Sequence, residues 1–284
     1  MIKLGLLGNN ISKSEMPNLI TKLGNEFDFE IKYELFDQAL KTKFDFKKFL
    51  RQIKEKNISG INVTYPFKEQ ALEHSIKLSE ETKLVKSTNL LLINESMTSH
   101  NTDYTGFLNT YKFNFNETPS KLAVLGGGGV GKSVCFALIK LGVKELYIIE
   151  KDHIKLEKLI KDLKKQLEQV YSIKLGKLIE IQSEFDGFLN CSEQGHVNTP
   201  GNPFDGLRLN NNQWSFDVVY TPAMTTFLKN SEKSGAIVIT GIDLFLFQGI
   251  ESFIIFTEQE KLRKKIMSNY DKIREHYFKK LITG

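Results

Sequence analysis

The segment from Gly126 to Ser133 satisfies two phosphate-binding patterns at once. As Gly126-x-Gly128-x-x-Gly131, it is the glycine turn of a dinucleotide-binding fold, whose ligand is a nicotinamide or flavin cofactor. As Gly126-x-x-x-x-Gly131-Lys132-Ser133, it is a P-loop, whose ligand is a nucleoside triphosphate with magnesium. In both motifs an apolar strand ends in glycines, and the N-terminus of the next helix then faces phosphate.

Two acidic residues further along the chain distinguish these motifs. The apolar segment 145–150 ends in Glu150, where a dinucleotide fold places the carboxylate that binds the ribose hydroxyls. A P-loop protein instead needs a later strand that ends in Asp, and the best candidate, Asp217, lies in the middle of the apolar segment 214–220. The sequence therefore favours the dinucleotide motif and predicts Lys132 and Ser133 in the first helical turn. A P-loop nucleoside triphosphatase is the alternative.

Three polar clusters precede residue 121: Ser12 and Ser14, the segment 62–68 that ends in Lys68, and the segment 100–106 around Asp103. Each has a simple structural explanation. Ser14 suits the cap of a helix, Lys68 a solvated surface, and Asp103 the N-cap of a helix over 104–112. If Lys68 instead pairs with Asp103, an ammonium and a carboxylate that share a substrate hydroxyl form an acid–base unit.

Composition limits the class of protein. The chain has 284 residues, 40% of them hydrophobic, which is enough for two domains with their own cores. No apolar run approaches the roughly 18 residues of a membrane span, and the N-terminus is typical of a first strand rather than of a signal peptide. Two cysteines favour a cytoplasmic protein without disulfides, and five histidines without ligand spacing predict no metal site.

The net charge of +5 is mild, and the lysines of 151–165 and 261–280 alternate with Glu and apolar residues as on solvated helix faces. We therefore expect a small-molecule ligand, neither nucleic acid nor a membrane as partner, and a monomer or homodimer.

Strand and helix patterns alternate along the chain, which predicts α/β architecture with parallel sheets. The polar segment 113–120 leads into a second domain. The expected strands are 2–7, 31–36, 59–64, 89–94, 121–126, 145–150, 178–182, 186–190, 214–220 and 235–240. The expected helices are 17–24, 45–56, 67–74, 78–86, 104–112, 131–141, 153–170, 222–233, 243–256 and 258–281.

Several motifs in this order resemble the shikimate/quinate dehydrogenase family, from about residue 4 to residue 257. They are Ser12-Lys-Ser14, Asn62-Val-Thr64-x-Pro66-x-Lys68, Asn89, Asn101-Thr102-Asp103-x-x-Gly106, the glycine turn, Asp217-Val-Val-Tyr220-x-Pro222 and Gly241-Ile-Asp-Leu-Phe-Leu-Phe-Gln248. The ordered set is far more specific than any one motif.

The resemblance implies a fold and an activity. An N-terminal open α/β substrate domain (1–103) is followed by a Rossmann domain (104–240), and the helices of 241–284 return to the first domain. The implied reaction is reversible hydride transfer between a nicotinamide cofactor and C3 of shikimate or quinate.

The resemblance also implies site residues. Lys68 and Asp103 are the catalytic acid–base pair. The substrate-binding residues are Ser12 and Ser14 for the carboxylate and Thr64, Asn89 and Gln248 for ring hydroxyls, with Tyr220 nearby. The cofactor-binding residues are Gly126, Gly128, Gly129, Val130, Gly131, Glu150, Val218 and Gly241.

Two segments depart from the family pattern. Lys86-Ser-Thr-Asn89-Leu90 stands for Gly-Ala-Val-Asn-Thr, and the segment 190–196 carries Gln194 and His196 where methionines near the nicotinamide are usual. A non-catalytic ligand sensor that keeps the fold is therefore a further alternative. Glu150-Lys151-Asp152 stands where NADP-using members have an Asn-Arg-Thr-like run, and two carboxylates repel a 2′-phosphate. We predict NAD as cofactor, with NADP possible because of Lys151.

Overall fold

A computed structural model of the chain describes residues 1–39, 44–94 and 96–282. The chain divides into two compact units. Unit 1 comprises Met1–Thr105 and Leu246–Ser268, and unit 2 comprises Gly106–Phe245 and Asn269–Gly284. The boundaries fall inside two helices, α5 (Thr102–Asn114) and α10 (Gly241–Thr257).

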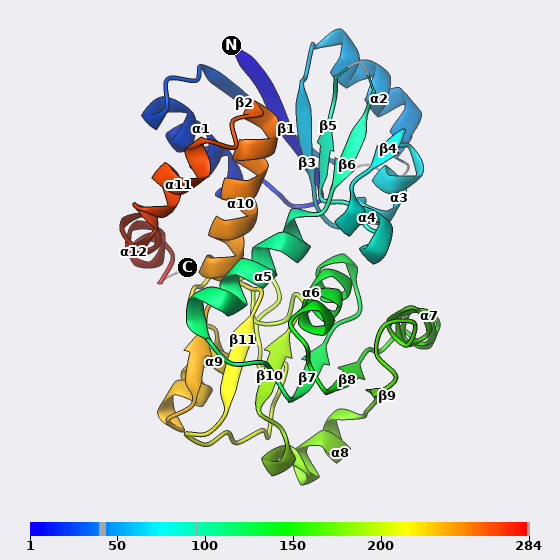
Figure 1. The fold of residues 1–284 in the computed structure, drawn as a ribbon, viewed down its shortest axis with the longest axis vertical. Helices are drawn as coiled ribbons and strands as arrows, with labels where there is room; N and C mark the ends of the chain where they lie inside the picture. The colour runs from blue at the N-terminus through cyan, green and yellow to red at the C-terminus, as the bar shows by residue number, and fades with distance from the viewer. Residues whose placement is uncertain (40–43, 95, 283–284) are drawn as a thin grey trace. The chain divides into compact units, whose positions relative to one another are not determined.

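Unit 1 is built on a six-stranded sheet in the order β2-β1-β3-β5-β6-β4. Strands β1, β2 and β3 are parallel, whereas β5 runs antiparallel to both β3 and β6 (Figure 1). The strands are β1 (Ile2–Gly8), β2 (Ile31–Asp37), β3 (Gly60–Val63), β4 (Lys77–Leu78), β5 (Leu90–Leu92) and β6 (Thr98–His100). The other helices of this unit are α1 (Met16–Glu26), α2 (Phe46–Glu55), α3 (Lys68–Glu73), α4 (Glu80–Val85) and α11 (Leu262–Met267).

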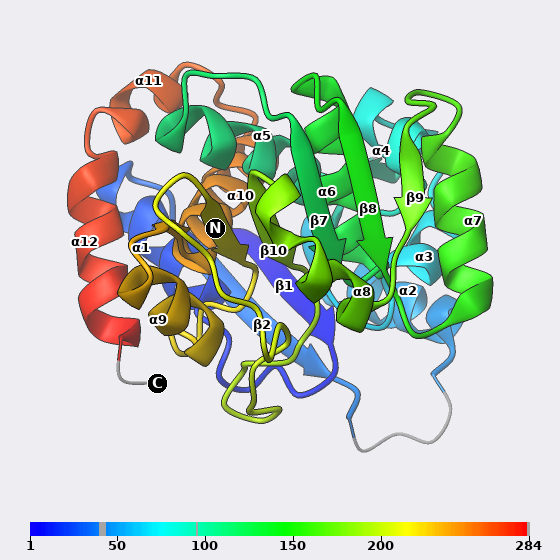
Figure 2. The same ribbon diagram turned by 90° about the horizontal axis from the view of Figure 1, so that it is seen from below.

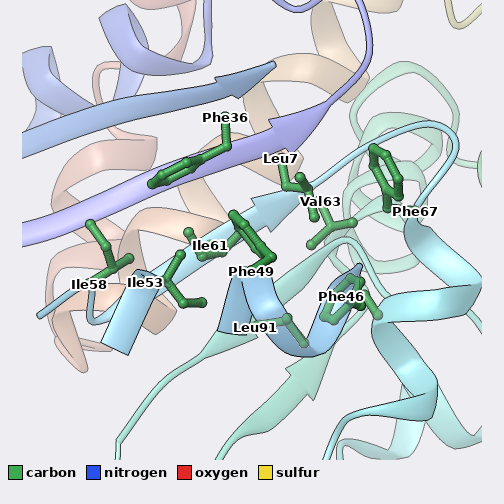
Figure 3. Packing of buried hydrophobic residues seen from close by; sticks show 11 residues of the cluster. Leu7, Phe36, Phe46, Phe49, Ile53, Ile58, Ile61, Val63, Phe67 and Leu91 are labelled. Atoms are coloured by element: carbon green, nitrogen blue, oxygen red, sulfur yellow. The ribbon is translucent and has the colours of Figure 1, made fainter. Parts of the chain in front are cut away.

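The alternation of side chains along β3 explains how this sheet is covered. Ile61 and Val63 belong to the cluster in which Phe49 of α2 packs on the sheet (Figure 3). On the other face, Gly60 lies against Phe256 of α10, where a Cβ would come within 2.3 Å of the ring. Since alternate residues of a strand point to opposite faces, Asn62 faces α10 as well.

Unit 2 contains a six-stranded, wholly parallel sheet in the order β12-β11-β10-β7-β8-β9, the strand order of a Rossmann fold. Figure 2 shows α7 beside β8 and β9. The strands are β7 (Lys121–Leu125), β8 (Glu145–Ile149), β9 (Val170–Ser172), β10 (Gly187–Asn190), β11 (Trp214–Asp217) and β12 (Ile237–Ile239). The remaining helices are α6 (Gly129–Lys140), α7 (His153–Leu163), α8 (Leu175–Glu180), α9 (Thr226–Lys233) and α12 (Tyr270–Leu281), with a 3₁₀ turn at Gln182–Glu184. The α/β class is as predicted.

The C-terminal helices differ from the expectation that all of 241–284 returns to the first domain. The end of α10 and α11 belong to unit 1, but α12 belongs to unit 2. Within unit 2, the guanidinium of Arg274 forms two hydrogen bonds, of 2.6 and 3.1 Å, with the buried carboxylate of Asp243, and Tyr270 donates to Asp243 at 2.9 Å. This paired charge fixes α12 to the start of α10.

Three predicted elements are wrong. Residues 178–182 do not form a strand, because Leu175, Leu178 and Ile179 recur at helical spacing and form α8. The helix predicted to reach residue 170 ends at Leu163, and Val170 opens strand β9 beside β8. The helix over 258–281 is interrupted around Ser268 and Asn269, where the chain passes from unit 1 to unit 2. The short strands β4 and β6 were not predicted.

Lys86 ends helix α4 in a left-handed conformation, with φ 55° and ψ 43°. This is the position where the family pattern has Gly. The left-handed conformation costs a residue with a Cβ roughly 1–2 kcal/mol. Glycine avoids this strain, but part of the gain is lost because glycine gives the unfolded chain more conformational entropy.

We therefore expect Lys86→Gly to raise the free energy of unfolding by about 0.5–1 kcal/mol, measured by urea denaturation. Lys83→Gly, inside the same helix, is the matched control and should lower it by about 1 kcal/mol. If both substitutions lower the free energy of unfolding equally, the left-handed backbone at Lys86 is not strained.

Candidate functional site

In unit 1 the polar residues singled out from the sequence gather at one edge of the sheet. Ser12 and Ser14 follow the carboxyl end of β1, Thr64 follows β3, and Asp103 follows β6. Asn89 precedes β5, but β5 is antiparallel, so its amino end lies at the same edge, and Val63 N donates to Asn89 O at 2.7 Å. Ligands bind at such carboxyl edges in open α/β sheets.

Lys68 and Asp103 form a buried ion pair through Nζ and Oδ2. Only 8% of Lys68 and 6% of Asp103 is exposed. The solvated-surface explanation of Lys68 is therefore wrong, because the first turn of α3 is packed against the core. The N-cap explanation of Asp103 is also wrong: α5 begins at Thr102, and Asn101 Oδ1 accepts from Tyr104 N at 3.0 Å. Asn101 caps the helix, which leaves the Asp103 carboxylate for Lys68.

Asn89 holds the Asp103 carboxylate from its other side. Its Nδ2 donates to Asp103 Oδ1 at 3.0 Å and to Thr102 Oγ1 at 2.8 Å, and its Oδ1 accepts from Thr102 N at 2.7 Å. Gln248 of α10 joins the same group, since Thr102 Oγ1 lies 3.5 Å from its Oε1. The structure thus brings together four of the predicted site residues, Lys68, Asp103, Asn89 and Gln248, and adds Thr102.

The serine loop after β1 is fixed by a residue that sequence reasoning missed. Asp37, at the end of β2, accepts from the backbone N–H groups of Asn10 and Ile11, each at 3.0 Å. Ser12 is exposed and Ser14 half-buried, and Ser14 Oγ accepts from Met16 N at 3.3 Å at the start of α1. Glu15, rather than Ser14, is the N-cap residue of α1, and it forms no side-chain cap hydrogen bond, so the cap predicted for Ser14 is wrong. The signal for Asp37 was its place directly after a strand.

In unit 2 the glycine turn has the geometry of a dinucleotide site. Gly126 has a φ of 103°, in the left-handed region, and a Cβ on Gly131 would lie 1.9 Å from the Gly126 carbonyl oxygen. Helix α6 begins at Gly129, and Gly128 has open space around it. The first backbone N–H groups of a helix have no partner inside it, so those near Gly129 and Val130 suit a pyrophosphate.

Glu150 closes this turn. Its Oε2 accepts from Gly127 N at 2.7 Å, and its Oε1 accepts from Lys151 N and Asp152 N at 2.7 and 3.0 Å. Asp152 in turn caps α7 through Lys155 N. The carboxylate therefore sits at the end of β8 beside the glycines, as a dinucleotide fold requires for the adenosine ribose.

The contacts of the P-loop residues do not support a triphosphate site. Lys132 and Ser133 are buried in the first turns of α6, as predicted, and Ser133 Oγ donates to Gly129 O at 2.9 Å. Asp217 is the last residue of β11, so its predicted position in the middle of a strand is wrong. Its carboxylate is fully buried and accepts from three protein donors, which gives it a structural role at this turn.

Those three donors make Asp217 the centre of a buried network at the carboxyl edge of the unit 2 sheet. Oδ1 accepts from Asn190 Nδ2 at 2.9 Å and Val219 N at 3.0 Å, and Oδ2 accepts from Thr225 Oγ1 at 2.8 Å. Burial raises the pKa of Asp217 to about 7, against the opposing effect of these hydrogen bonds. Sequence reasoning gave none of these residues a structural role.

The same edge carries the other cofactor residues expected from the sequence. Gly241 opens α10 so close to β11 that a Cβ would lie 2.6 Å from the carbonyl oxygens of Val218 and Val219. The Tyr220 ring stacks on Phe245 at 4.8 Å between centroids. In the altered segment, Asn190 Nδ2 donates to Gln194 O at 2.9 Å, and His196 Nδ1 accepts from Asn198 N at 3.1 Å. His196 thus takes part in its own turn.

Among the residues that the structure describes, none of the clusters of His, Cys, Asp and Glu could hold a metal ion. Within the same ranges, each helix is too short or too polar to cross a membrane.

Comparison with known proteins was made for both sequence and structure. Residues 6–91 match the family model described as the shikimate dehydrogenase substrate binding domain. The chain is 28% identical over 269 residues to a shikimate dehydrogenase (NADP(+)) of Caldicellulosiruptor bescii, covering 90% of this chain and 89% of the relative. It is 27% identical to a quinate/shikimate dehydrogenase (NAD(+)) of Corynebacterium efficiens, covering 94% and 98%.

Among solved structures, quinate dehydrogenase from Corynebacterium glutamicum in complex with NAD is similar with a TM-score of 0.82 and 26% identity, over 94% of this chain and 99% of that chain. Shikimate 5-dehydrogenase from Thermus thermophilus, in complex with NADP(H) and shikimate, has a TM-score of 0.77 and 25% identity, over 91% and 94%.

Asp217 predicts a dependence of stability on pH. Because its folded-state pKa of about 7 lies above the ordinary value of 3.8, the native state binds more protons than the unfolded state between these values. This contribution therefore lowers stability as pH rises through that window. Asn at this position keeps Oδ1 as acceptor for Asn190 and Val219 and can donate from Nδ2 to the Thr225 oxygen, all without a charge. The stability of Asp217→Asn relative to wild type should therefore rise between pH 5 and pH 8.

The expected gain is a few kcal/mol, since a tenfold change in an ionisation equilibrium corresponds to about 1.4 kcal/mol. Urea unfolding of both proteins across the pH range measures it, and the other titrating groups cancel in the difference. If the difference in free energy of unfolding between the two proteins does not change with pH, the pKa of Asp217 is not raised by burial.

Proposed function

The chain belongs to the shikimate/quinate dehydrogenase family, and we propose that it is an NAD(P)-dependent oxidoreductase that transfers hydride reversibly between the cofactor and C3 of shikimate or quinate. The observation that carries this proposal is the buried ion pair of Lys68 and Asp103 at the carboxyl edge of the unit 1 sheet. Relatives named for the same reaction, and the dinucleotide geometry of the glycine turn, support it.

Proton transfer is assigned to Lys68. The nicotinamide supplies the hydride when it is bound. As negative charge develops on the C3 oxygen, Lys68 Nζ donates a proton to that oxygen, and in the reverse direction it accepts the hydroxyl proton. Asp103 holds the ammonium in place, while Asn89 fixes the carboxylate.

The substrate is a small anionic polyol. Ser12 and Ser14 bind its carboxylate, and Thr64, Asn89 and Gln248 bind ring hydroxyls. Both hydrogens of the Asn89 amide are engaged, so this residue accepts from a substrate hydroxyl through Oδ1. For Tyr220, which belongs to unit 2, contact with the substrate stays a prediction. Cys135 and Cys191 are buried thiols that form no disulfide, which fits the cytoplasmic location that we propose.

The cofactor is NAD in preference to NADP. The Glu150 carboxylate lies beside the glycine turn, where it binds ribose hydroxyls and repels a 2′-phosphate. Asp152 adds a second carboxylate at the start of α7. For the cofactor turn in unit 2, Gly126, Gly128, Gly129, Val130 and Gly131 approach the pyrophosphate, and Val218 and Gly241 lie at the edge assigned to the nicotinamide.

The cofactor preference predicts a kcat/KM with NAD at least about tenfold higher than with NADP, because each 1.4 kcal/mol of repulsion is a factor of ten. NADH or NADPH formation from shikimate and from quinate, followed by absorbance, gives both values. A preference for NADP would overturn this assignment, and inactivity with both cofactors on both polyols would overturn the proposed reaction.

Lys68→Met should lower kcat about 10²–10⁴-fold, because it removes the proton donor while it keeps most of the side-chain volume. The affinity for NADH, measured by fluorescence titration, should not change. Lys83→Met, an exposed lysine on α4, is the control and should keep wild-type kcat. Wild-type activity of Lys68→Met would exclude the proposed mechanism, and loss of both activity and NADH binding would indicate misfolding.

A further inference from the structure

We propose that Ser252 and Asn62 are positioning residues for the acid–base pair. They belong to a continuous chain of hydrogen bonds that begins at Tyr33 and ends at Lys68. This inference rests on the proposed function, because both residues act through the groups assigned to proton transfer.

The fold places Asn62 and Ser252 opposite one another inside unit 1. Asn62 points from β3 toward α10, because its neighbours Ile61 and Val63 face the other side of the sheet. Ser252 lies one helical turn beyond Gln248 on α10 and is fully buried. Asn62 Nδ2 donates to Ser252 Oγ at 3.0 Å. A buried amide needs such a partner, since an unsatisfied buried donor is destabilising.

The first half of the chain has a fixed direction. Tyr33 Oη donates to Asn62 Oδ1 at 2.8 Å, and burial raises the pKa of Tyr33 well above its usual value, so the phenol stays protonated. Ser252 gives its single hydroxyl hydrogen to Gln248 O at 2.8 Å. Its oxygen is therefore an acceptor toward Asn62 and toward Thr102 Oγ1, which lies 3.3 Å away.

The second half leads to the catalytic groups. The single hydroxyl hydrogen of Thr102 has two acceptors in reach, Ser252 Oγ at 3.3 Å and Gln248 Oε1 at 3.5 Å, and its oxygen accepts from Asn89 Nδ2 at 2.8 Å. The other hydrogen of that amide goes to Asp103 Oδ1 at 3.0 Å, and Asp103 Oδ2 pairs with Lys68. Each donor is thus directed by the acceptor next to it, and hydrogen bonds in such a chain strengthen one another. Removal of the Ser252 oxygen takes away the nearer of the two acceptors of Thr102 and the partner of Asn62, which loosens the support of the amide that orients Asp103.

A buried helical serine without this role makes fewer contacts. Ser231 of α9 is also buried and donates to Phe227 O four residues earlier, at 3.0 Å. Ser252 makes the same backbone contact but also contacts the side chains of Asn62 and Thr102. Ser231→Ala is therefore a matched control for the loss of a buried hydroxyl.

The test compares Ser252→Ala, Ser231→Ala, Tyr33→Phe and the double variant Tyr33→Phe/Ser252→Ala in the full chain. Ser252→Ala should lower kcat/KM for the polyol about tenfold, mostly through kcat, from the loss of about 1.4 kcal/mol of orientation. The Kd for NADH should stay within twofold of wild type. Ser231→Ala should keep wild-type kcat. Tyr33→Phe should lower kcat about threefold, and the double variant should lose little more than Ser252→Ala, because both act along one chain.

A wild-type kcat for Ser252→Ala, or an equal loss in Ser231→Ala, overturns the positioning role. If Ser252→Ala does not fold, Tyr33→Phe decides in its place, and a wild-type kcat overturns the inference. Failure of the proposed function is distinguishable, because a wild-type protein that oxidises neither shikimate nor quinate contradicts both proposals before any variant is made.

Discussion

The buried ion pair of Lys68 and Asp103 is the interaction on which the rest of the candidate site depends. Removing two charges from water is costly, and their attraction repays this only when further hydrogen bonds satisfy the remaining lone pairs. Here Asn89 supplies that support, and it reaches Asp103 because β5 runs antiparallel between β3 and β6. The short antiparallel insertion therefore does more than extend the sheet. It brings an amide, a carboxylate and an ammonium to one edge.

The two units present their ligand-binding groups in different ways. In unit 1 polar side chains are collected at the strand ends and held by other side chains. In unit 2 the glycine turn presents backbone N–H groups to the ligand. Glycines at 131 and 241 allow neighbouring segments of backbone to approach closely. Carboxylates at strand ends stabilise the following loops in both units: the exposed Asp37 fixes the serine loop, and the buried Asp217 fixes the segment after β11.

Much of this could be predicted from the sequence, for reasons that also explain the failures. The glycine turn and the paired Lys68 and Asp103 were visible because their chemistry depends on residue type and order. Residues 178–182 were misassigned because the apolar residues Leu178, Ile179 and Ile181 fit a short strand as well as the last turn of α8. Asp217 was misplaced because the apolar residues after it belong to a loop. Ser252 gave no signal, since its role depends on which face of α10 meets β3.

The double use of Glu150 limits how this cofactor site can evolve or be redesigned. One oxygen of its carboxylate anchors the glycine turn through Gly127, and the other organises the two residues that lead into α7. A substitution of Glu150 that allows a 2′-phosphate to bind would also remove these hydrogen bonds. A change of preference from NAD to NADP therefore requires compensating substitutions in the glycine turn, and a substitution of Glu150 alone is not sufficient.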